Sequence, residues 1–503
     1  VGRQVILRPA VQKRYVELVE PTLHDQRPDI DRLRDAMDDL EFEADLSVLK
    51  TLPTILRKND FKVTAVVVDE ALIAVEPGDT SAQNYAIAFD LGTTTVVATL
   101  LDLLTGTPMA VKSMLNKQQP FGADVISRIS ATMMDPLAAG LMQTAGLATL
   151  NELIAEVCTE AGISKDQVYE TAIAGNATMV EILLGVDPEP VGVAPFITAA
   201  QKWPVFTAAE VGIEILPSAR VFLFPAFGAY VGGDIVAGVL ATGMDRDKRV
   251  RLLIDVGTNC EIVLSNGDTI LTTAAPAGPA FEAASIACGM RAADGAIEVV
   301  QVTDEGIKLG VIGDVEPVGI CGSGLVDAVY VLHKAKLIDD SGRFATDEQA
   351  QEIAPHLASR LLTREAGDRI FVLHWDGDEP TVYLSQRDVR ELQFAKASIA
   401  TGWRLLLEEV GLVDEDVQQV LLAGSFGSYL SPASAIGIGL VPKLPVMRIV
   451  SAGNIAGEGA KMVLLSAQER NGAMALLDEI DYIELSDRAD FNDKFVERLS
   501  FPA

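Results

Sequence analysis

Two short motifs in the sequence combine an aspartate, a glycine and polar side chains. Residues 90–95 read Asp-Leu-Gly-Thr-Thr-Thr, and residues 255–259 read Asp-Val-Gly-Thr-Asn. The glycine lets the backbone turn sharply, so that the amides that follow it can face a phosphate group. Threonine hydroxyls add donors, and the aspartate is suited to holding Mg²⁺, mainly through water. The motifs therefore predict binding of ATP and Mg²⁺ by Asp90, Gly92, Thr93, Thr94, Thr95, Asp255, Gly257, Thr258 and Asn259.

Each motif ends an apolar run that is typical of a strand, and two more such runs follow each motif. A phosphate turn inside the first hairpin of a three-stranded meander differs from the strand-to-helix loop of Walker-type nucleotide enzymes. The recurrence of this pattern predicts an α/β protein with two duplicated lobes, each carrying one motif. The expected strands are residues 85–89, 96–103 and 109–115 in the first lobe, and 252–254, 261–264 and 269–273 in the second.

The chain has 503 residues, too many for one hydrophobic core, so we expect several domains. We expect a connecting arm over residues 1–28 and a small α/β middle domain over 29–82, with no site residues. Residues 83–250 form the expected first lobe, and residues 251–503 form the second lobe with a carboxy-terminal tail. In the small domain we expect helices at 31–39 and 46–56, and paired strands at 63–68 and 71–75.

Composition narrows the class of partner. Lysine and arginine total 40 against 71 acidic residues, a net charge of −31 that disfavours nucleic acid and anionic membranes and favours a protein partner. The apolar stretch 221–244 contains a proline, an aspartate and several glycines, so it predicts a buried strand and helix rather than a membrane span. The cysteines Cys158, Cys260, Cys288 and Cys321 lie far apart, as expected for reduced thiols in a cytoplasmic protein.

Two further glycine-rich turns precede expected helices. Residues 319–324 read Gly-Ile-Cys-Gly-Ser-Gly, and residues 421–427 read Leu-Leu-Ala-Gly-Ser-Phe-Gly. Both can present amides at a helix start, where the helix dipole favours an anion. The alternative is that these glycines only permit close packing of the helices. Gly322, Ser323 and Gly324 are nucleotide candidates on the first interpretation.

The order of the motifs resembles the superfamily of sugar and acetate kinases, heat-shock ATPases and actin. The resemblance covers residues 85–485 and implies a two-lobed, actin-like ATPase fold with ribonuclease-H-like lobes. It also implies that small residues on two connecting helices, near 233–240 and 457–460, let these helices cross and form a hinge between the lobes. The nucleoside would then be bordered by Gly424, Ser425, Gly453 and Asn454.

Within this superfamily, several strings resemble the reductive activators of corrinoid proteins. They are Phe-Gly-Ala-Asp-Val-Ile-Ser-Arg at 121–128, Ala-Gly-Asn-Ala-Thr-Met at 174–179, and Gly-Pro-Ala-Phe-Glu at 278–282 with Cys-Gly-Met at 288–290. The resemblance implies ATP-driven reduction of cobalt(II) to cobalt(I) in a corrinoid (iron-sulfur) protein, with a low-potential electron donor. The family's amino-terminal [2Fe-2S] domain has no counterpart here, because the sequence has no Cys-x₄-Cys-x₂-Cys run. Either the chain is truncated and the cluster belongs to a missing domain, which is the expectation favoured here, or the electron comes from another protein.

The general base for ATP hydrolysis stays open at this stage. Asp234 and Glu282 are candidates by their position in the motifs, and either could instead cap a helix or complete a buried ion pair. Asn176 could donate to a phosphate or cap the following helix.

Three other functions compete with this hypothesis. The same fold serves small-molecule kinases, and it serves actin-like or chaperone-type proteins whose product is a conformational change. It also serves activators of 2-hydroxyacyl-CoA dehydratases, in which cysteines placed loosely like Cys288 and Cys321 hold a [4Fe-4S] cluster between two subunits. The sequence leaves open which corrinoid protein is the partner and whether the chain forms a homodimer.

Overall fold

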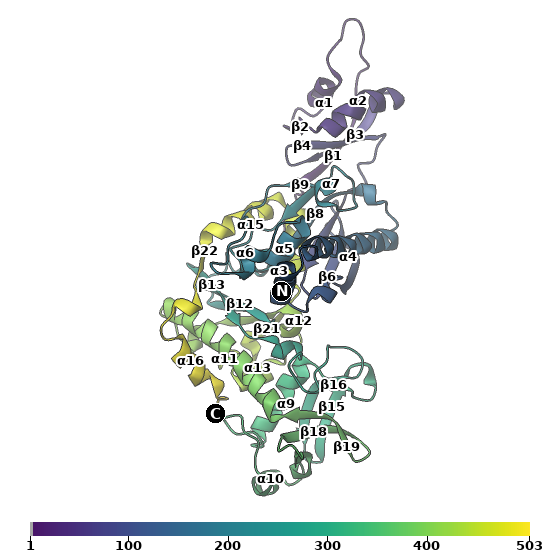
Figure 1. Cartoon of the computed structure of the whole chain (residues 1–503). Coiled ribbons are helices and arrows are strands. Elements are labelled where there is room, and N and C mark those ends of the chain that lie inside the picture. Colours follow the sequence, from purple (N-terminus) through teal and green to yellow (C-terminus); the bar gives the residue numbers. More distant parts are fainter. Residues whose placement is uncertain (1–3) are drawn as a thin grey trace. The chain divides into compact units, whose positions relative to one another are not determined.

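A computed structural model describes residues 4–503 and divides them into two compact units. Of the described residues, the amino-terminal unit contains 4–243 together with 455–478 (Figure 1). The carboxy-terminal unit contains residues 244–454 and 479–503. The described chain therefore passes from one unit to the other three times. Residues 455–478 were predicted to belong to the second lobe, residues 251–503, and instead fold with the amino-terminal unit.

The amino-terminal unit begins with a small domain built on a four-stranded sheet in the order β1-β3-β4-β2. The two expected helices and the expected strand pair are present. Residues 11–17, expected in a connecting arm, instead form a strand that pairs antiparallel with β3, from Val11↔Val68 to Glu17↔Lys62. All but the first residue of β3 are buried, so its outer edge needs a partner strand. The elements are β1 (Val11–Glu17), α1 (Asp29–Ala36), β2 (Glu43–Ala44), α2 (Leu46–Lys58), β3 (Lys62–Val68) and β4 (Ala71–Pro77).

The main sheet of the amino-terminal unit has the order β7-β6-β5-β8-β10-β9. Strands β5, β6 and β7 form an antiparallel meander, and β8 and β10 continue the sheet parallel to β5. The strands are β5 (Tyr85–Leu91), β6 (Thr95–Asp102), β7 (Pro108–Leu115), β8 (Val168–Gly175), β9 (Phe206–Thr207) and β10 (Arg220–Leu223). The helices are α3 (Val125–Met134), α4 (Ala138–Ala161), α5 (Ala177–Leu184), α6 (Glu189–Gly192), α7 (Ala208–Val211), α8 (Gly233–Thr242), α14 (Ile455–Leu465) and α15 (Ala467–Glu479).

The main sheet of the carboxy-terminal unit repeats this plan in the order β21-β20-β11-β12-β13-β22. Strands β11, β12 and β13 form the antiparallel meander, and β20 and β21 lie parallel to β11. The strands are β11 (Arg251–Asp255), β12 (Asn259–Ser265), β13 (Ile270–Pro276), β20 (Gln419–Ala423), β21 (Ile449–Gly453) and β22 (Ile480–Tyr482). Five strands correspond in order and in sense of pairing, with β7-β6-β5-β8-β10 matching β13-β12-β11-β20-β21, and this match confirms the predicted duplication. The sixth strands differ: β9 pairs antiparallel with β10, whereas β22 pairs parallel with β13 at the other edge of its sheet.

The carboxy-terminal unit also carries two three-stranded sheets, β15-β14-β16 and β17-β18-β19. Its large core includes the buried Trp403 and Phe371. The remaining strands are β14 (Ala296–Thr303), β15 (Gly306–Val311), β16 (Gly319–Ile320), β17 (Leu361–Thr363), β18 (Arg369–Asp376) and β19 (Glu379–Ser385). The helices are α9 (Gly322–Lys334), α10 (Asp347–Ile353), α11 (Gln386–Glu409), α12 (Gly424–Gly427), α13 (Pro432–Ile438) and α16 (Phe491–Leu499).

Helices α8 and α14 cross closely, as the resemblance implied. A Cβ atom on Gly238 would lie 2.6 Å from Ile455 Cδ1, and one on Gly459 would lie 2.3 Å from the Ala237 carbonyl oxygen. Each helix directly adjoins a point where the chain changes units.

Among residues 4–503, no helix combines the length and the apolarity needed to cross a membrane. The apolar stretch 221–244 forms most of β10 and all of α8.

Helix α15 is held in the amino-terminal unit by buried charge. Arg470 pairs with Glu170 on β8 and with Asp69 in the turn between β3 and β4. Its guanidinium also lies 4.9 Å from the ring centroid of Phe222 on β10. Figure 1 shows α15, in yellow, beside the blue elements of this unit. Because Arg470 and Glu170 are both buried, breaking this pair would leave an uncompensated charge in the interior.

Candidate nucleotide site

In the amino-terminal unit, the first phosphate turn lies beside the end of β8. Strands β5 and β8 are parallel and pair Asp90 with Ala174. Asn176, which follows β8, donates from Nδ2 to Thr93 Oγ1 at 3.0 Å. Its Oδ1 accepts from the Met179 amide at 2.9 Å and thereby caps α5. The capping alternative for Asn176 is therefore observed, and donation to a phosphate stays a prediction.

The backbone of this turn is braced from inside the protein. Buried Arg128 on α3 donates from Nη2 to the Thr93 carbonyl at 2.6 Å. Asn116 donates from Nδ2 to the Gly92 carbonyl at 3.1 Å, and its own amide donates to the Thr94 carbonyl at 2.8 Å. A Cβ atom on Gly92 would lie 2.3 Å from the Thr95 carbonyl oxygen, so this turn requires glycine.

These bracing residues were not assigned a role from the sequence. Burial lowers the pKa of Arg128 to about 10, so the guanidinium stays protonated at neutral pH. Its charge lies directly behind the turn. Two features of the sequence could have indicated these bracing roles. One is an arginine on a helix that carries no other charged residue, and the other is an asparagine directly after the third strand of the meander. Thr94 and Thr95 are exposed and Thr93 is half-buried, so all three hydroxyls can reach solvent or a ligand.

Asp234 lies in the first turn of α8, next to Asn176. A Cβ atom on Gly232 would lie 2.6 Å from Asn176 Cα and 2.8 Å from Asp234 Oδ1. Burial raises the pKa of Asp234 to about 6, and this rise is opposed by the Ile235 amide, which donates to Oδ1 at 3.0 Å. A carboxyl with a pKa near neutrality suits a group that accepts a proton during turnover.

In the carboxy-terminal unit, three parallel strands end at one edge of the sheet. Asp255 at the end of β11 pairs with Ala423 on β20, and Ala423 pairs with Gly453 on β21. Gly424 has a φ of +85°, and a Cβ atom there would lie 2.5 Å from Asp255 Oδ1. Ligands of parallel α/β sheets bind at such carboxyl edges. The structure thus brings together predicted residues that are far apart in sequence: Asp255, Gly257, Thr258, Asn259, Gly424, Ser425, Gly453 and Asn454.

Glu282 joins the second phosphate turn through a hydrogen bond. It ends a short 3₁₀ helix, η3 (Pro279–Glu282), and is half-buried. Thr258 Oγ1 donates to Glu282 Oε1 at 2.6 Å. The carboxylate therefore holds the Thr258 side chain directly.

The glycines of the 319–324 turn make close packing contacts. A Cβ atom on Gly322 would lie 1.9 Å from the Phe281 carbonyl oxygen, and one on Gly324 would lie 2.0 Å from the Ile297 carbonyl oxygen. These distances match the packing alternative. Ser323 is half-buried and lies 3.3 Å from Cys321 Sγ, and a nucleotide contact from this turn stays a prediction.

The cysteines are poorly placed for a cluster shared between subunits. Cys321 is 1% exposed, and its thiol donates to the Ile297 carbonyl at 3.3 Å. Burial raises the pKa of the Cys158, Cys260 and Cys288 thiols, which keeps them protonated. Within residues 4–503, no three His, Cys, Asp or Glu side chains gather as a metal site.

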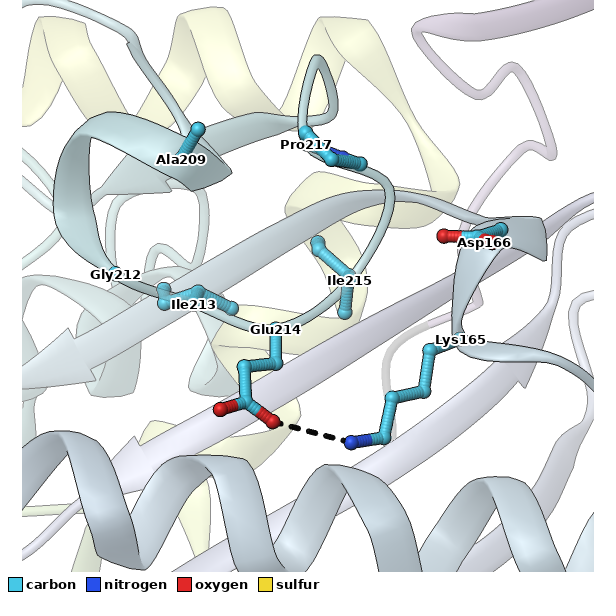
Figure 2. Close-up of a pocket in the computed structure, with 8 residues that line it drawn as sticks. All are labelled: Lys165, Asp166, Ala209, Gly212, Ile213, Glu214, Ile215 and Pro217. Atoms are coloured by element: carbon cyan, nitrogen blue, oxygen red, sulfur yellow. Dashed lines mark hydrogen bonds and ion pairs between the residues drawn. The ribbon is translucent and has the colours of Figure 1, made fainter.

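An open hollow of about 440 Å³ lies elsewhere in the amino-terminal unit (Figure 2). Lys165 and Glu214 form an ion pair of 3.2 Å across its rim. Its described lining includes none of the predicted site residues. The lining residues are Lys165, Asp166, Ala209, Gly212, Ile213, Glu214, Ile215 and Pro217.

Comparison with known proteins accounts for the chain from end to end. Residues 249–503 match the C-terminal domain of RACo, the ASKHA domain; residues 85–247 match the RACo middle region; and residues 1–82 match the RACo linker region.

Two curated relatives and one solved structure extend this match. Corrinoid activation enzyme RamQ of Eubacterium limosum is 36% identical over 488 residues, 96% of this chain and 80% of the relative. The Co(II) methylated amine-specific corrinoid protein reductase of Methanosarcina barkeri is 24% identical over 455 residues, 83% of this chain and 77% of the relative. The solved structure of a reductive activator for corrinoid, iron-sulfur protein is 37% identical, with a TM-score of 0.87 over 100% of this chain and 80% of that one. The two-lobed, actin-like ATPase fold class that the motif resemblance implied is confirmed. This chain belongs to the RACo family.

Proposed function

We propose that the chain is an ATP-dependent reductive activator of a corrinoid protein, which uses ATP binding and hydrolysis to drive cobalt(II) to cobalt(I). The observation that carries this proposal is the 36% identity, over 96% of the chain, to a corrinoid activation enzyme. The geometry supports it, because each of the two duplicated sheets places an aspartate and a glycine-threonine turn at the end of a strand.

In this proposal Asp90 and Asp255 hold Mg²⁺ mainly through water and position the attacking water molecule. Thr93, Thr94 and Asn259 donate to phosphate oxygens from their side chains, and Thr258, whose hydroxyl proton goes to Glu282, holds a phosphate oxygen through its backbone amide. We assign the general base to Asp234, because its raised pKa fits proton transfer near neutral pH. Glu282 acts through Thr258, whose hydroxyl it already binds, and is a positioning residue. The nucleoside is bordered by Gly424, Ser425, Gly453 and Asn454. The turn that contains Gly322, Ser323 and Gly324 supplies the remaining proposed contacts with the nucleotide.

ATP is needed because the reduction is uphill for an ordinary donor. For a one-electron step, each ~59 mV of shortfall costs about tenfold in the equilibrium constant. ATP can offset this only through its difference in affinity for two conformations of the protein. We propose that these conformations differ in the arrangement of the two units, and that the ATP-bound form binds the corrinoid protein in an easily reduced state. Hydrolysis then releases the partner.

The electron comes from a low-potential donor, in this proposal one that carries a [2Fe-2S] cluster. Residues 4–503 do not fit such a cluster, because no cysteine group that could ligate one is present among them. The cluster therefore enters no step that is assigned to these residues.

The test mixes the protein with a candidate corrinoid protein, a low-potential reductant and MgATP under anaerobic conditions, and follows cobalt(I) absorbance. We expect cobalt(I) to accumulate with ATP and to stay low without nucleotide. Equal accumulation with and without ATP would contradict the proposal. A parallel screen for phosphate transfer to sugars and carboxylic acids addresses the kinase alternative, which predicts a phosphorylated product and no cobalt(I).

A further inference from the structure

An enclosed cavity lies directly behind the nucleotide edge of the amino-terminal unit. Its walls come from the end of β8, from α5, from the start of α8 and from the loop that contains Trp203. Its volume is about 10 Å³. A space of this size holds the centre of one water molecule if polar partners are present.

Glu181 on α5 supplies such a partner. The side chain is 1% exposed, and Oε1 accepts from the Ala199 amide at 2.7 Å. Among the described residues, no donor or acceptor reaches Oε2, although this atom is buried. Burial and the nearby charge of Asp187 raise the pKa of Glu181, and the hydrogen bond from the Ala199 amide lowers it. A buried carboxyl oxygen without a hydrogen-bond partner is costly, and a water molecule in the cavity would satisfy it.

The cavity wall is also the support of the site. Gly175 and Ala177, on either side of Asn176, line it, and so does Gly233, which precedes Asp234. A Cβ atom on Gly233 would lie 3.3 Å from the Gly175 carbonyl oxygen, so the two segments touch. A change in the filling of the cavity would therefore displace both Asn176 and Asp234.

We infer that Glu181 binds one buried water molecule in this cavity through Oε2 and thereby positions Asn176 and Asp234 for ATP hydrolysis. This inference rests on the proposed ATPase function. Glu181 contacts neither substrate nor metal in it and is a positioning residue.

Two substitutions separate the polar role of Glu181 from its volume. Glu181→Gln keeps an acceptor for the Ala199 amide and offers an N–H donor to the water, so kcat and KM should stay within about twofold of wild type. Glu181→Met keeps the length of the side chain but binds no water. We expect it to lower kcat about tenfold while the KM for ATP changes less than about threefold, because the reacting groups are misplaced rather than removed. Wild-type kcat in Glu181→Met would overturn the inference.

A second measurement needs neither activity nor nucleotide. A high-resolution crystal structure of the wild type should show a water molecule within hydrogen-bonding distance of Glu181 Oε2, and the structure of Glu181→Met should lack it. An empty cavity in the wild-type crystal would overturn the inference. If the water is found but ATP yields no cobalt(I), the proposed function fails while the water site stands.

Discussion

The two phosphate turns occupy equivalent places in two equivalent sheets, yet different chemistry supports them. Behind the first turn lie donors: the buried guanidinium of Arg128 and the amide of Asn116 both bind its backbone carbonyls. Beside the second turn lies an acceptor, the Glu282 carboxylate, which binds the Thr258 hydroxyl. A positive brace favours an anion, whereas an extra carboxylate favours a cation. Within the proposed site we therefore expect the first turn to favour phosphate and the second turn to favour Mg²⁺.

The hairpins differ in length as well. Asp90 pairs with Val97, whereas Asp255 pairs with Glu261, so the first turn is one residue longer. The extra residue gives the first turn three consecutive threonines, of which two are exposed. This turn can therefore offer more hydroxyl donors to a phosphate than the second turn can.

Removing the metal-binding carboxylate of the second turn should have the largest effect. Asp255→Asn keeps the size of the side chain but removes the negative charge, so we expect ATP hydrolysis to fall about a thousandfold. Phosphate release measures the rate, and circular dichroism should show an intact fold. The matched substitution Asp90→Asn should cost less, because the first turn is assigned mainly to phosphate. Unchanged hydrolysis in Asp255→Asn would refute the assignment of this site.

The second-largest effect is expected from replacing Arg128, whose guanidinium holds the backbone of the first turn. Arg128→Met leaves the Thr93 carbonyl and the Gln118 Oε1 atom without their buried donor. We expect a loss of about 3 kcal/mol in the free energy of unfolding and about tenfold weaker ATP binding. Urea denaturation and calorimetry measure the two effects. The corresponding change at the second turn, Thr258→Val, should cost only about 1 kcal/mol, and equal losses in both variants would remove the contrast between the turns.

A smaller effect should follow from crowding Asp255. Gly424→Ala places a Cβ atom 2.5 Å from Asp255 Oδ1 and on backbone with positive φ, so we expect the KM for ATP to rise about tenfold. Gly411→Ala is the matched control, since Gly411 lies outside the proposed site and also has a positive φ, +70°, but no atom within 4 Å of the added carbon. The control should show only the backbone strain, about 1 kcal/mol of stability. A similar KM in both variants would show that the contact with Asp255 is unimportant.

The smallest effect concerns pH and Asp234. Its folded-state pKa of about 6 lies above the value of roughly 4 in an unfolded chain. The folded state therefore binds the proton more tightly, and this stabilisation is complete below about pH 4 and is lost as the pH rises through about 6. Relative to wild type, Asp234→Asn should gain ~2 kcal/mol of stability between pH 4 and pH 8.

Urea denaturation at the two pH values tests this prediction, and the same stability difference at both would contradict it. In the activity assay, wild-type hydrolysis should fall as the pH drops below about 6. The residual activity of Asp234→Asn should lack this acid limb.

Sequence reasoning was most successful where the signal is local. The strands around both motifs, and the two helices and the strand pair of the small domain, appear within a few residues of their expected ranges, because apolar alternation and turn-forming glycines act over a few positions. It failed where a partner is distant. Strand β1 was expected in an arm because its residues are partly charged, and only pairing with β3 makes it a strand. Residues 455–478 fold with the first lobe because Arg470 meets Glu170 there.

The chemistry of the site divides in the same way. The residue types of the two turns predict phosphate and metal binding by themselves, since glycine, threonine and aspartate have that capacity wherever the chain places them. Strand register decided that Gly424 lies against Asp255, and helix packing decided that Arg128 reaches Thr93 and that Glu181 is sealed beside a cavity. Such contacts form only when elements that are distant in sequence pack together and remove the side chains from water. A short stretch of sequence does not determine that packing.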